Sequence, residues 1–211
     1  RPPSQGLYDP VNEHDSCGIG FIANINGRKT NEIVFDGLRI LDNLTHRGAV
    51  GADPTMGDGS GIVIQIPHRF YKEECKKEDI ILPAYGNYAV AQVFFPNDEG
   101  LLPYCESLFK KSVIRNGQKF LGWRKVPIRD SAISSSVRRT TPIIKQCFVA
   151  SGKNCRDQNE FERKLFVIRK QLSNKYRKSV KLIKFSHSVY ISSFSSRIVN
   201  YKGMLLPHTL G

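Results

Sequence analysis

Apolar residues recur along this chain with two different periods. In four segments they return every three to four positions, the spacing of one face of an α-helix. In other segments they form short runs bounded by Gly, Pro or Asn, which is typical of strands. The pattern predicts helices over residues 31–45, 68–77, 98–114 and 158–173, strands over 18–25, 61–67, 87–96, 119–127 and 142–150, and a strand pair within 187–205 that turns near Ser195 and Ser196.

The order of these segments indicates a fold class. Strands come in neighbouring pairs, helices lie between the pairs, and runs such as residues 87–96 are apolar on both faces. This predicts an α+β fold with helices packed over buried sheets. Residues 48–61 contain five glycines and a proline and are predicted to form a loop. No helix or strand is predicted after the last strand pair, so we expect the domain to be incomplete at its C-terminal end.

Composition restricts the cellular setting. The chain has 211 residues, 40% of them hydrophobic, which suffices for one sizeable core. No apolar run reaches the roughly 18 residues that span a bilayer, and residues 1–15 do not resemble a signal peptide, so we expect a cytoplasmic protein. The five cysteines are an odd number and include no Cys-x-x-Cys, which favours free thiols and no metal site. They are Cys17, Cys75, Cys105, Cys147 and Cys155.

The net charge of +13 is concentrated in the second half of the chain. Residues 1–100 contain 9 Lys/Arg and 14 Asp/Glu, a net of −5, whereas residues 101–211 contain 23 and 5, a net of +18. Such asymmetry marks some nucleic-acid surfaces. Here the basic residues are scattered through helical and strand segments, without a basic tail or the motifs of RNA-binding sheets. We therefore expect a solvated basic surface, or one that meets an acidic neighbour, rather than nucleic-acid binding.

Cys17 lies where a strand-like run begins, in the stretch His-Asp-Ser-Cys-Gly-Ile-Gly-Phe at residues 14–21. Gly18 and Gly20 are poor strand formers and leave the backbone beside the thiol bare. A packing cysteine does not need such neighbours, whereas a nucleophile that lets a substrate approach the main chain does. Two interpretations stay open at this point: an ordinary thiol at a strand edge, and a catalytic nucleophile.

Several blocks of the sequence together resemble one family. They are EHDSCGIGFIANINGR, LTHRGAVGADPTMGDGSGIVIQIPHRFY, NYAVAQVFFP, GWRKVP and NYKGML. They resemble the glutaminase domains of glutamate synthase large subunits, which are class II (N-terminal nucleophile) glutamine amidotransferases. The resemblance runs from about Gly6 to Leu205, and its most specific part is the stretch from Leu44 to His68.

The resemblance implies an N-terminal-nucleophile fold, an αββα four-layer sandwich. Residues 1–16 would be a leader that is removed, and residues 17–211 part of the amidotransferase domain. The Cys17 thiolate would attack the side-chain amide of glutamine. Its own α-amino group, with an ordinary pKa of about 7.7–8.0, would accept the proton. A γ-glutamyl thioester would form, ammonia would leave, and water would release glutamate.

The motif Thr-His-Arg-Gly supplies two more candidate residues. In the family, a loop with this motif lies beside the nucleophile, so the resemblance implies that Arg47 and Gly48 bind substrate. The guanidinium of Arg47 would contact the glutamine carboxylate, and Gly48 would let the main chain approach. A helix C-terminus with a cationic side chain and a Gly cap explains the same residues, and both interpretations can hold together. His46 is expected to be structural.

The family pattern also extends beyond these residues. In the second half of the family's domain, a His-x-Arg-Phe-Ser-Thr-Asn motif supplies an arginine that binds the glutamine carboxylate, and an Asn-Gly pair forms the oxyanion hole. The arginine motif does not occur in residues 1–211, so we expect that half of the domain, with its oxyanion-hole pair, to lie outside them. Loss of one oxyanion donor costs about 10²–10³ in rate, so we expect no glutaminase activity from this chain alone. The full-length enzyme implied would contain FMN and an iron–sulfur cluster, take electrons from NAD(P)H or ferredoxin, and convert 2-oxoglutarate to glutamate; none of these cofactors is expected in this chain.

The expected partners are glutamine, the remainder of the large subunit and a small subunit, with no membrane. A second class of function stays open. In it, the chain is an inactive fragment or a non-catalytic interaction module whose basic C-terminal half binds an acidic protein or nucleic acid.

Overall fold

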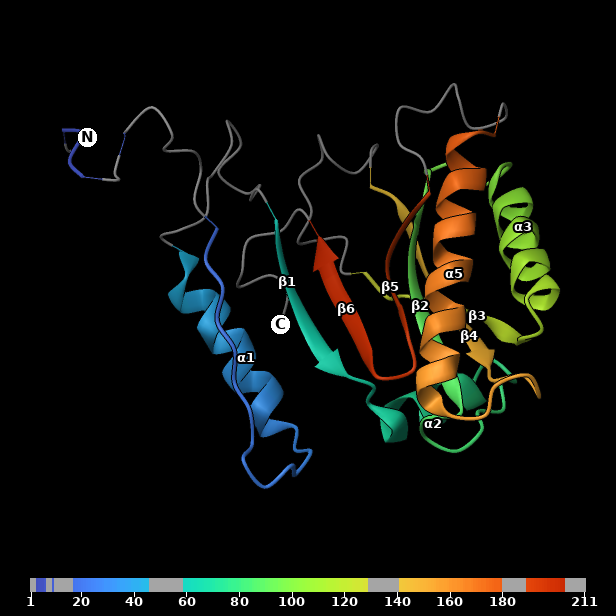
Figure 1. Ribbon diagram of the computed structural model, residues 1–211, viewed down its shortest axis with the longest axis horizontal. Helices are drawn as coiled ribbons and strands as arrows, with labels where there is room; N and C mark the ends of the chain where they lie inside the picture. Colours follow the sequence, from blue (N-terminus) through green and yellow to red (C-terminus); the bar gives the residue numbers. More distant parts are fainter. Residues whose placement is uncertain are drawn as a thin grey trace. The chain divides into compact units, whose positions relative to one another are not determined.

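The computed structural model describes residues 3–6, 9, 17–45, 59–128, 141–179 and 189–203 (Figure 1). The helices are α1 (Glu32–Asn43), α2 (His68–Lys76), α3 (Leu102–Arg115) and α5 (Gln158–Arg177), and the strands are β1 (Ser60–Gln65), β2 (Tyr88–Phe95), β3 (Lys119–Lys125), β4 (Ile143–Ala150), β5 (Tyr190–Ser195) and β6 (Ile198–Gly203). The chain divides into two compact units, residues 63–201 and residues 1–62 with 202–211, which are described separately.

The larger unit is built on a four-stranded sheet in the order β3–β4–β2–β5, in which every neighbouring pair is antiparallel. Of the two central strands, β2 is almost fully buried and β4 is buried from Gln146 to Ala150, as their apolar composition predicts. Their register places Ala91 opposite Cys147 and Gln92 opposite Gln146. Because successive side chains of a strand point to opposite faces, odd-numbered and even-numbered residues of β2 and β4 belong to different layers.

The odd-numbered face is covered by helices. Ala89, Ala91, Val93 and Cys147 lie in one buried cluster with apolar residues of α3 and α5, and Figure 1 shows both helices on the same side of the sheet. On α5 the cluster takes Phe161, Leu165, Ile168, Leu172 and Tyr176, which follow the helical spacing of three to four residues.

The even-numbered face packs against a different layer. Tyr88, Val90 and Phe148 are buried together with Tyr71 and Cys75 of α2. Ile66, which follows β1, and Val199 of β6 belong to the same cluster, and β1 and β6 pair with each other in a separate two-stranded sheet. Within this unit, the helices α3 and α5 therefore cover one face of the four-stranded sheet, and α2 with Ile66 and Val199 covers the other. The α+β class with antiparallel sheets is confirmed, and the four-layer arrangement stays a prediction.

In the smaller unit, residues 17–25 run beside helix α1 (Figure 1). The strand predicted over 18–25 is wrong, because these residues form neither a strand nor a helix. A strand needs a hydrogen-bonded neighbour, and no described strand pairs with them. Two glycines further weaken strand formation. The apolar side chains of the run are not buried, and those of Ile19 and Phe21 are 90% and 91% exposed.

The prediction of two strands and a bend within 187–205 is confirmed, but their predicted pairing with each other is wrong. Two strands occur, and the chain bends between Ser195 and Ile198 as expected. They do not pair with each other, because β5 joins the edge of the four-stranded sheet at β2 and β6 pairs with β1. The turn was visible in the sequence, but the choice of neighbouring strand depends on distant segments.

Helix boundaries differ from the predicted ones where a polar residue or a distant contact decides them. Helix α3 begins at Leu102 rather than residue 98, because the Asp98 carboxylate accepts hydrogen bonds from the backbone N–H groups of Gly100 and Leu101 and forms a turn. Helix α5 continues to Arg177 rather than residue 173. Its last turn is held by Tyr176, whose hydroxyl donates to the Cys105 carbonyl at 2.8 Å.

Candidate functional site

Cys17 is the first residue of the described segment 17–45 and carries an exposed, free thiol. Cys75, Cys105 and Cys147 are buried, and Cys155 is half-buried. Burial raises the pKa of the Cys75 thiol to about 12 and that of Cys105 to about 11. Cys147 is affected in the same direction, because burial holds the pKa of its thiol well above the ordinary value. A thiolate is the reactive form of cysteine, so these three are unreactive core residues, and Cys17 is the most exposed of the five thiols.

Local backbone contacts fix the path of the chain after Cys17. The Asn24 side-chain oxygen accepts hydrogen bonds from the backbone N–H groups of Asn26 and Arg28 at 3.0 and 3.2 Å. The Gly27 N–H donates to the Asn24 carbonyl, and Gly27 has a φ of 67°, a conformation that favours glycine. This turn, which the Asn-Gly pair predicts, reverses the chain into helix α1. The segment that carries Cys17 and α1 are thereby brought together.

The remaining site residues expected from the resemblance, Arg47 and Gly48, lie outside the described residues, as does His46. The same holds for most of the glycine-rich loop predicted over 48–61. Their substrate-binding roles therefore stay predictions. Of the candidate site residues, the structure describes Cys17.

A row of polar side chains crosses the four-stranded sheet on the face that packs against α2. Arg124 of β3, Gln146 of β4, Gln92 of β2 and Ser193 of β5 are direct cross-strand neighbours. All four are buried. Buried polar groups are costly unless they are hydrogen-bonded, so this row indicates a specific structural requirement.

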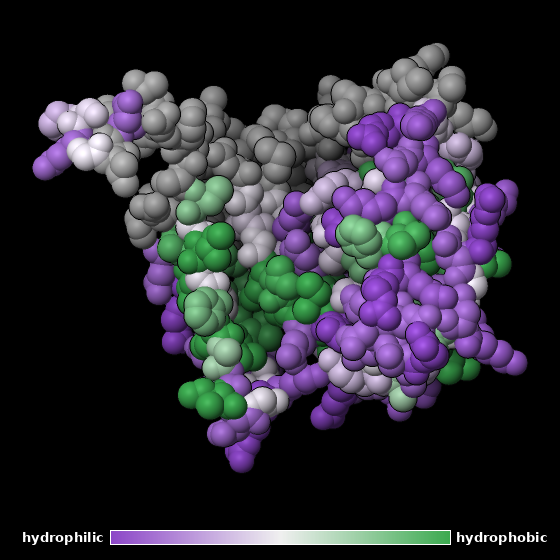
Figure 2. Space-filling view, in the orientation of Figure 1, coloured by the Kyte–Doolittle hydropathy of each residue, from purple (hydrophilic) through white to green (hydrophobic). Residues whose placement is uncertain are grey.

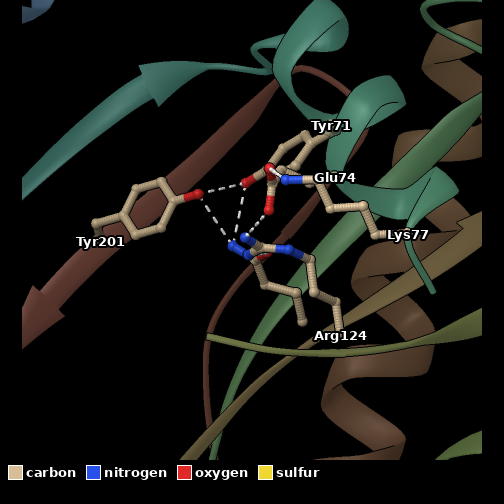
Figure 3. Close-up of polar contacts among 6 residues, drawn as sticks. Tyr71, Glu74, Lys77, Arg124 and Tyr201 are labelled. Atoms are coloured by element: carbon tan, nitrogen blue, oxygen red, sulfur yellow. Dashed lines mark hydrogen bonds and ion pairs between the residues drawn. The ribbon is translucent and has the colours of Figure 1, made fainter. Parts of the chain in front are cut away.

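The centre of the row is Gln146, whose side chain is 0% exposed. Its amide nitrogen lies 3.0 Å from the Gln92 side-chain oxygen, 3.1 Å from the Tyr71 hydroxyl and 3.0 Å from the Tyr201 hydroxyl. Its side-chain oxygen accepts from Arg124 Nη1 at 3.1 Å. The two tyrosine hydroxyls are 2.7 Å apart. Figure 3 shows the tyrosines and Arg124 converging on this point from α2, β6 and β3.

The network ends in an ion pair at the edge of α2. Arg124 Nη2 donates to Glu74 Oε2 at 2.9 Å, and Lys77 donates to the other oxygen (Figure 3). The hydrogen bonds from Lys77 and Arg124 hold the pKa of Glu74 below its ordinary value. Burial, together with Tyr201, raises the pKa of Tyr71 well above its ordinary value, so its hydroxyl stays protonated. No described buried side-chain polar atom lacks a hydrogen-bond partner, so the network connects the layers through satisfied polar contacts.

Sequence reasoning missed this network, although a signal was present. Gln92 and Gln146 are single uncharged polar residues inside the apolar runs YAVAQVFF and IIKQCFVA. A lone amide in a strand that is buried on both faces predicts a buried partner. Its identity is not visible in the sequence, because Tyr71 and Tyr201 are 130 positions apart.

A further feature is the basic outer surface of the helices α3 and α5. Helix α5 carries six Lys/Arg and two Glu, and α3 carries three Lys/Arg and one Glu. The three carboxylates are already engaged, Glu106 by Lys145, Glu160 by Arg156, and Glu162 by Ser195 and Ser196. Figure 2 shows mainly hydrophilic residues over α5. The excess of basic residues in the second half of the sequence is thus exposed on this helical layer.

The described residues offer no ligand set for an inorganic cofactor. No group of three His, Cys, Asp or Glu side chains among them is arranged to bind a metal ion. Iron–sulfur clusters are held by cysteine thiolates, and Cys105 and Cys147 lie in one apolar cluster while Cys75 lies in another. In the part of the chain that the structure describes, no helix is long and apolar enough to cross a membrane.

Comparison with known families decides the relationship. The family model of the class II glutamine amidotransferases matches residues 17–211, a range that begins at Cys17. This chain belongs to the class II glutamine amidotransferases. The resemblance seen in the sequence blocks is thereby confirmed.

Curated relatives of this amidotransferase chain include several glutamate synthases. The NADPH glutamate synthase large chain of Bacillus subtilis (strain 168) is 40% identical over 206 residues, which cover 98% of this chain and 13% of the relative. The NADH glutamate synthase of Saccharomyces cerevisiae is 35% identical over 98% of this chain and 10% of its own length. The ferredoxin-dependent glutamate synthase 2, chloroplastic, of Arabidopsis thaliana is 32% identical over 100% of this chain and 13% of its own. The chain thus spans only 10–13% of the length of these relatives.

Proposed function

We propose that this chain is the glutamine-hydrolysing part of a glutamate synthase and that Cys17 is its nucleophile. The observation that carries the proposal is the family match, which begins at Cys17, together with the glutamate synthases that match nearly the whole chain. The exposure of Cys17, in contrast to the burial of Cys75, Cys105 and Cys147, supports its role.

In the proposed reaction, Cys17 Sγ attacks the carbonyl carbon of the glutamine side-chain amide. The α-amino group of Cys17 accepts the thiol proton and passes it to the departing nitrogen. The carbon–nitrogen bond breaks, ammonia leaves, and a γ-glutamyl thioester remains on the sulfur. Water then attacks the thioester carbon, glutamate is released, and the thiol is restored.

This chemistry requires that the leader of residues 1–16 is removed. While Ser16 remains attached, the nitrogen of Cys17 is an amide and cannot accept a proton. General-base assistance is worth about 10²–10⁴-fold in rate, so the unprocessed chain is expected to be slower by about that factor. Arg47 and Gly48 are proposed to frame the substrate, with the guanidinium on the glutamine carboxylate.

We also propose a wider enzyme to which this chain contributes, and the names of the relatives support it. Those names specify NADPH, NADH or ferredoxin, and we propose that ammonia from this domain is used elsewhere in a longer polypeptide for reductive formation of glutamate from 2-oxoglutarate. FMN and an iron–sulfur cluster would be bound there as well. The fourth, outer helical layer of the αββα sandwich and a cytoplasmic location are also part of this proposal.

The test is glutamine hydrolysis by the longest natural polypeptide that contains residues 1–211. Cys17→Ser is expected to lower ammonia release by at least about 10³-fold, because the reaction depends on the nucleophile. Cys155→Ser, which alters a half-buried thiol, serves as the matched control and is expected to stay within about twofold of wild type. Equal activity of wild type and Cys17→Ser would refute the proposal.

The basic surface of α3 and α5 supports a second candidate, a non-catalytic module that binds an acidic protein or nucleic acid. Binding to nucleic acid would weaken steeply with salt, since each neutralised phosphate releases counterions. Tight, salt-sensitive binding of duplex DNA by a chain that does not hydrolyse glutamine would favour this candidate over the first.

A further inference from the structure

We infer that Gly20 and Ile40 form a positioning pair that holds the Cys17 segment against helix α1. The inference rests on the proposed function, because it concerns how the nucleophile of that reaction is placed. In this pair, position 20 must remain without a side chain, and Ile40 imposes this requirement.

The steric requirement is visible in the contacts of Gly20. The three heavy atoms nearest to a Cβ placed on Gly20 all belong to Ile40. The Ile40 Cγ2 atom would lie closer than the 3.0 Å that real Cβ atoms essentially never show, and the Ile40 Cβ and Cδ1 atoms would lie at 3.6 and 3.8 Å. A methyl group at position 20 therefore cannot be accommodated unless the segment moves away from the helix or Ile40 changes its rotamer.

Ile40 cannot move easily, because it is β-branched and belongs to a helix. Such side chains have one strongly preferred χ1 rotamer in helices. The backbone of Ile40 is fixed as well, since its carbonyl accepts a hydrogen bond from the Leu44 N–H at 3.1 Å. The segment that carries Cys17 is thus the part that would shift.

Glycine is required here for its size and not for its backbone freedom. Gly20 is not in the left-handed region, unlike Gly27, whose φ is 67°. The neighbours Ile19 and Phe21 are about nine-tenths exposed, so neither fixes this stretch by burial. The contact at Gly20 is therefore a close approach between segment and helix that the burial of its neighbours does not explain.

The contact is near enough to Cys17 to affect chemistry there. Residues 17 to 20 span at most about 10 Å even when fully extended, so a shift at Gly20 displaces the thiol. A displacement of about 1 Å at a reacting group costs about 10²-fold in rate. We expect Gly20→Ala to lower the rate of reaction of Cys17 with a bound substrate by about 10- to 100-fold.

A second substitution, at Ile40, is expected to restore the rate that Gly20→Ala lowers. Ile40→Leu removes the Cγ2 methyl that meets position 20 but keeps the volume of the side chain. Gly20→Ala combined with Ile40→Leu is therefore expected to recover to within about threefold of wild type. The matched control combines Gly20→Ala with Ile33→Leu, a change of the same kind elsewhere on α1, and is expected to stay as slow as Gly20→Ala alone.

The experiment measures labelling of Cys17 by a diazoketone analogue of glutamine in the longest natural polypeptide that contains residues 1–211. Iodoacetamide, which needs only an accessible thiol, is used in parallel and is expected to react with Gly20→Ala within about twofold of wild type. Slow analogue labelling with normal iodoacetamide labelling of Cys17 reports displacement of the thiol from the substrate. Continued protection of the buried thiols Cys75, Cys105 and Cys147 from iodoacetamide excludes unfolding as the cause.

Each outcome decides the inference. Slow Gly20→Ala with rescue by Ile40→Leu, and none by Ile33→Leu, supports it. Normal labelling of Gly20→Ala, or a failure of Ile40→Leu to rescue, overturns it and leaves the proposed function standing. A wild type whose Cys17 is not labelled by the analogue refutes the proposed function, and the positioning role falls with it.

Discussion

Replacement of the buried amide at the centre of the polar row, Gln146→Leu, gives the most demanding test of the fold. Leucine has a similar size but can make no hydrogen bond. Tyr71 and Tyr201 keep each other as partners at 2.7 Å. The Gln92 side-chain oxygen and Arg124 Nη1 lose the partners that they have at 3.0 and 3.1 Å.

The size of the effect follows from these two groups. A buried polar group left without a partner costs about 1–3 kcal/mol, and more when it is charged. Two such groups give about 2–6 kcal/mol, and the buried apolar surface of leucine returns about 1–2 kcal/mol. We expect Gln146→Leu to lower the free energy of unfolding by about 3 kcal/mol, a large share of the roughly 5–15 kcal/mol of an ordinary domain.

Urea unfolding followed by the fluorescence of Trp123 measures this free energy. Trp123 is the single tryptophan of the chain and packs edge-on against Phe95 and Phe109, so it reports the core directly. Gln171→Leu makes the same chemical change on the exposed side of α5, and we expect it to stay within about 0.5 kcal/mol of wild type.

A double replacement tests the pairwise contact itself. Gln92→Leu with Gln146→Leu removes both amides, so the Gln92 oxygen is no longer left without a partner. The double variant should therefore be more stable than the sum of the two single effects predicts, by at least about 1 kcal/mol. A Gln146→Leu protein within about 1 kcal/mol of wild type, or strict additivity of the two changes, would refute the reasoning.

Three further expectations concern charge, capping and thiol reactivity. The pKa of Glu74 is lowered in the folded state, so the ionised carboxylate stabilises the fold at pH values above its ordinary pKa of 4.5. This contribution is lost as the pH falls through the lower pKa of the folded state. Glu74→Gln should therefore reduce the loss of stability during acid titration. Asp157 caps α5 by accepting the Glu160 N–H at 2.8 Å, so Asp157→Ala should cost about 1 kcal/mol in urea unfolding, whereas Asp157→Asn should cost less. Iodoacetamide at about pH 8 should modify Cys17 before Cys75, whose thiol has a pKa raised to about 12 by burial, and peptide mass spectrometry measures the order; faster loss of the Cys75 thiol would contradict the described core.

Much of the larger unit was predictable because its elements carry their signals locally. Residues 87–96 form a nearly continuous apolar run and give β2, and the spacing of apolar residues from 158 onward gives α5. The extra turn of α5 was also encoded, since Tyr176 follows Leu172 by four residues, and both are buried.

What could not be predicted depends on contacts between distant segments. The alternation of apolar residues and glycines around Cys17 indicated a strand, but no described strand pairs with it. Strands β5 and β6 are neighbours in sequence and belong to different sheets. The candidate nucleophile itself was found from its glycine neighbours and its family motif. Its partners Arg47 and Gly48 stay predictions, because they lie outside the described residues.

The most direct test of the proposed chemistry is the mass of the peptide that carries the reacted thiol. Protein that is actively hydrolysing glutamine is treated with the diazoketone analogue, digested and analysed by mass spectrometry. The mechanism predicts one adduct, on a peptide whose first residue is Cys17. An adduct on a peptide that still carries Ser16 in fully active protein, or on a thiol other than Cys17, would contradict a nucleophile that supplies its own amine as the base.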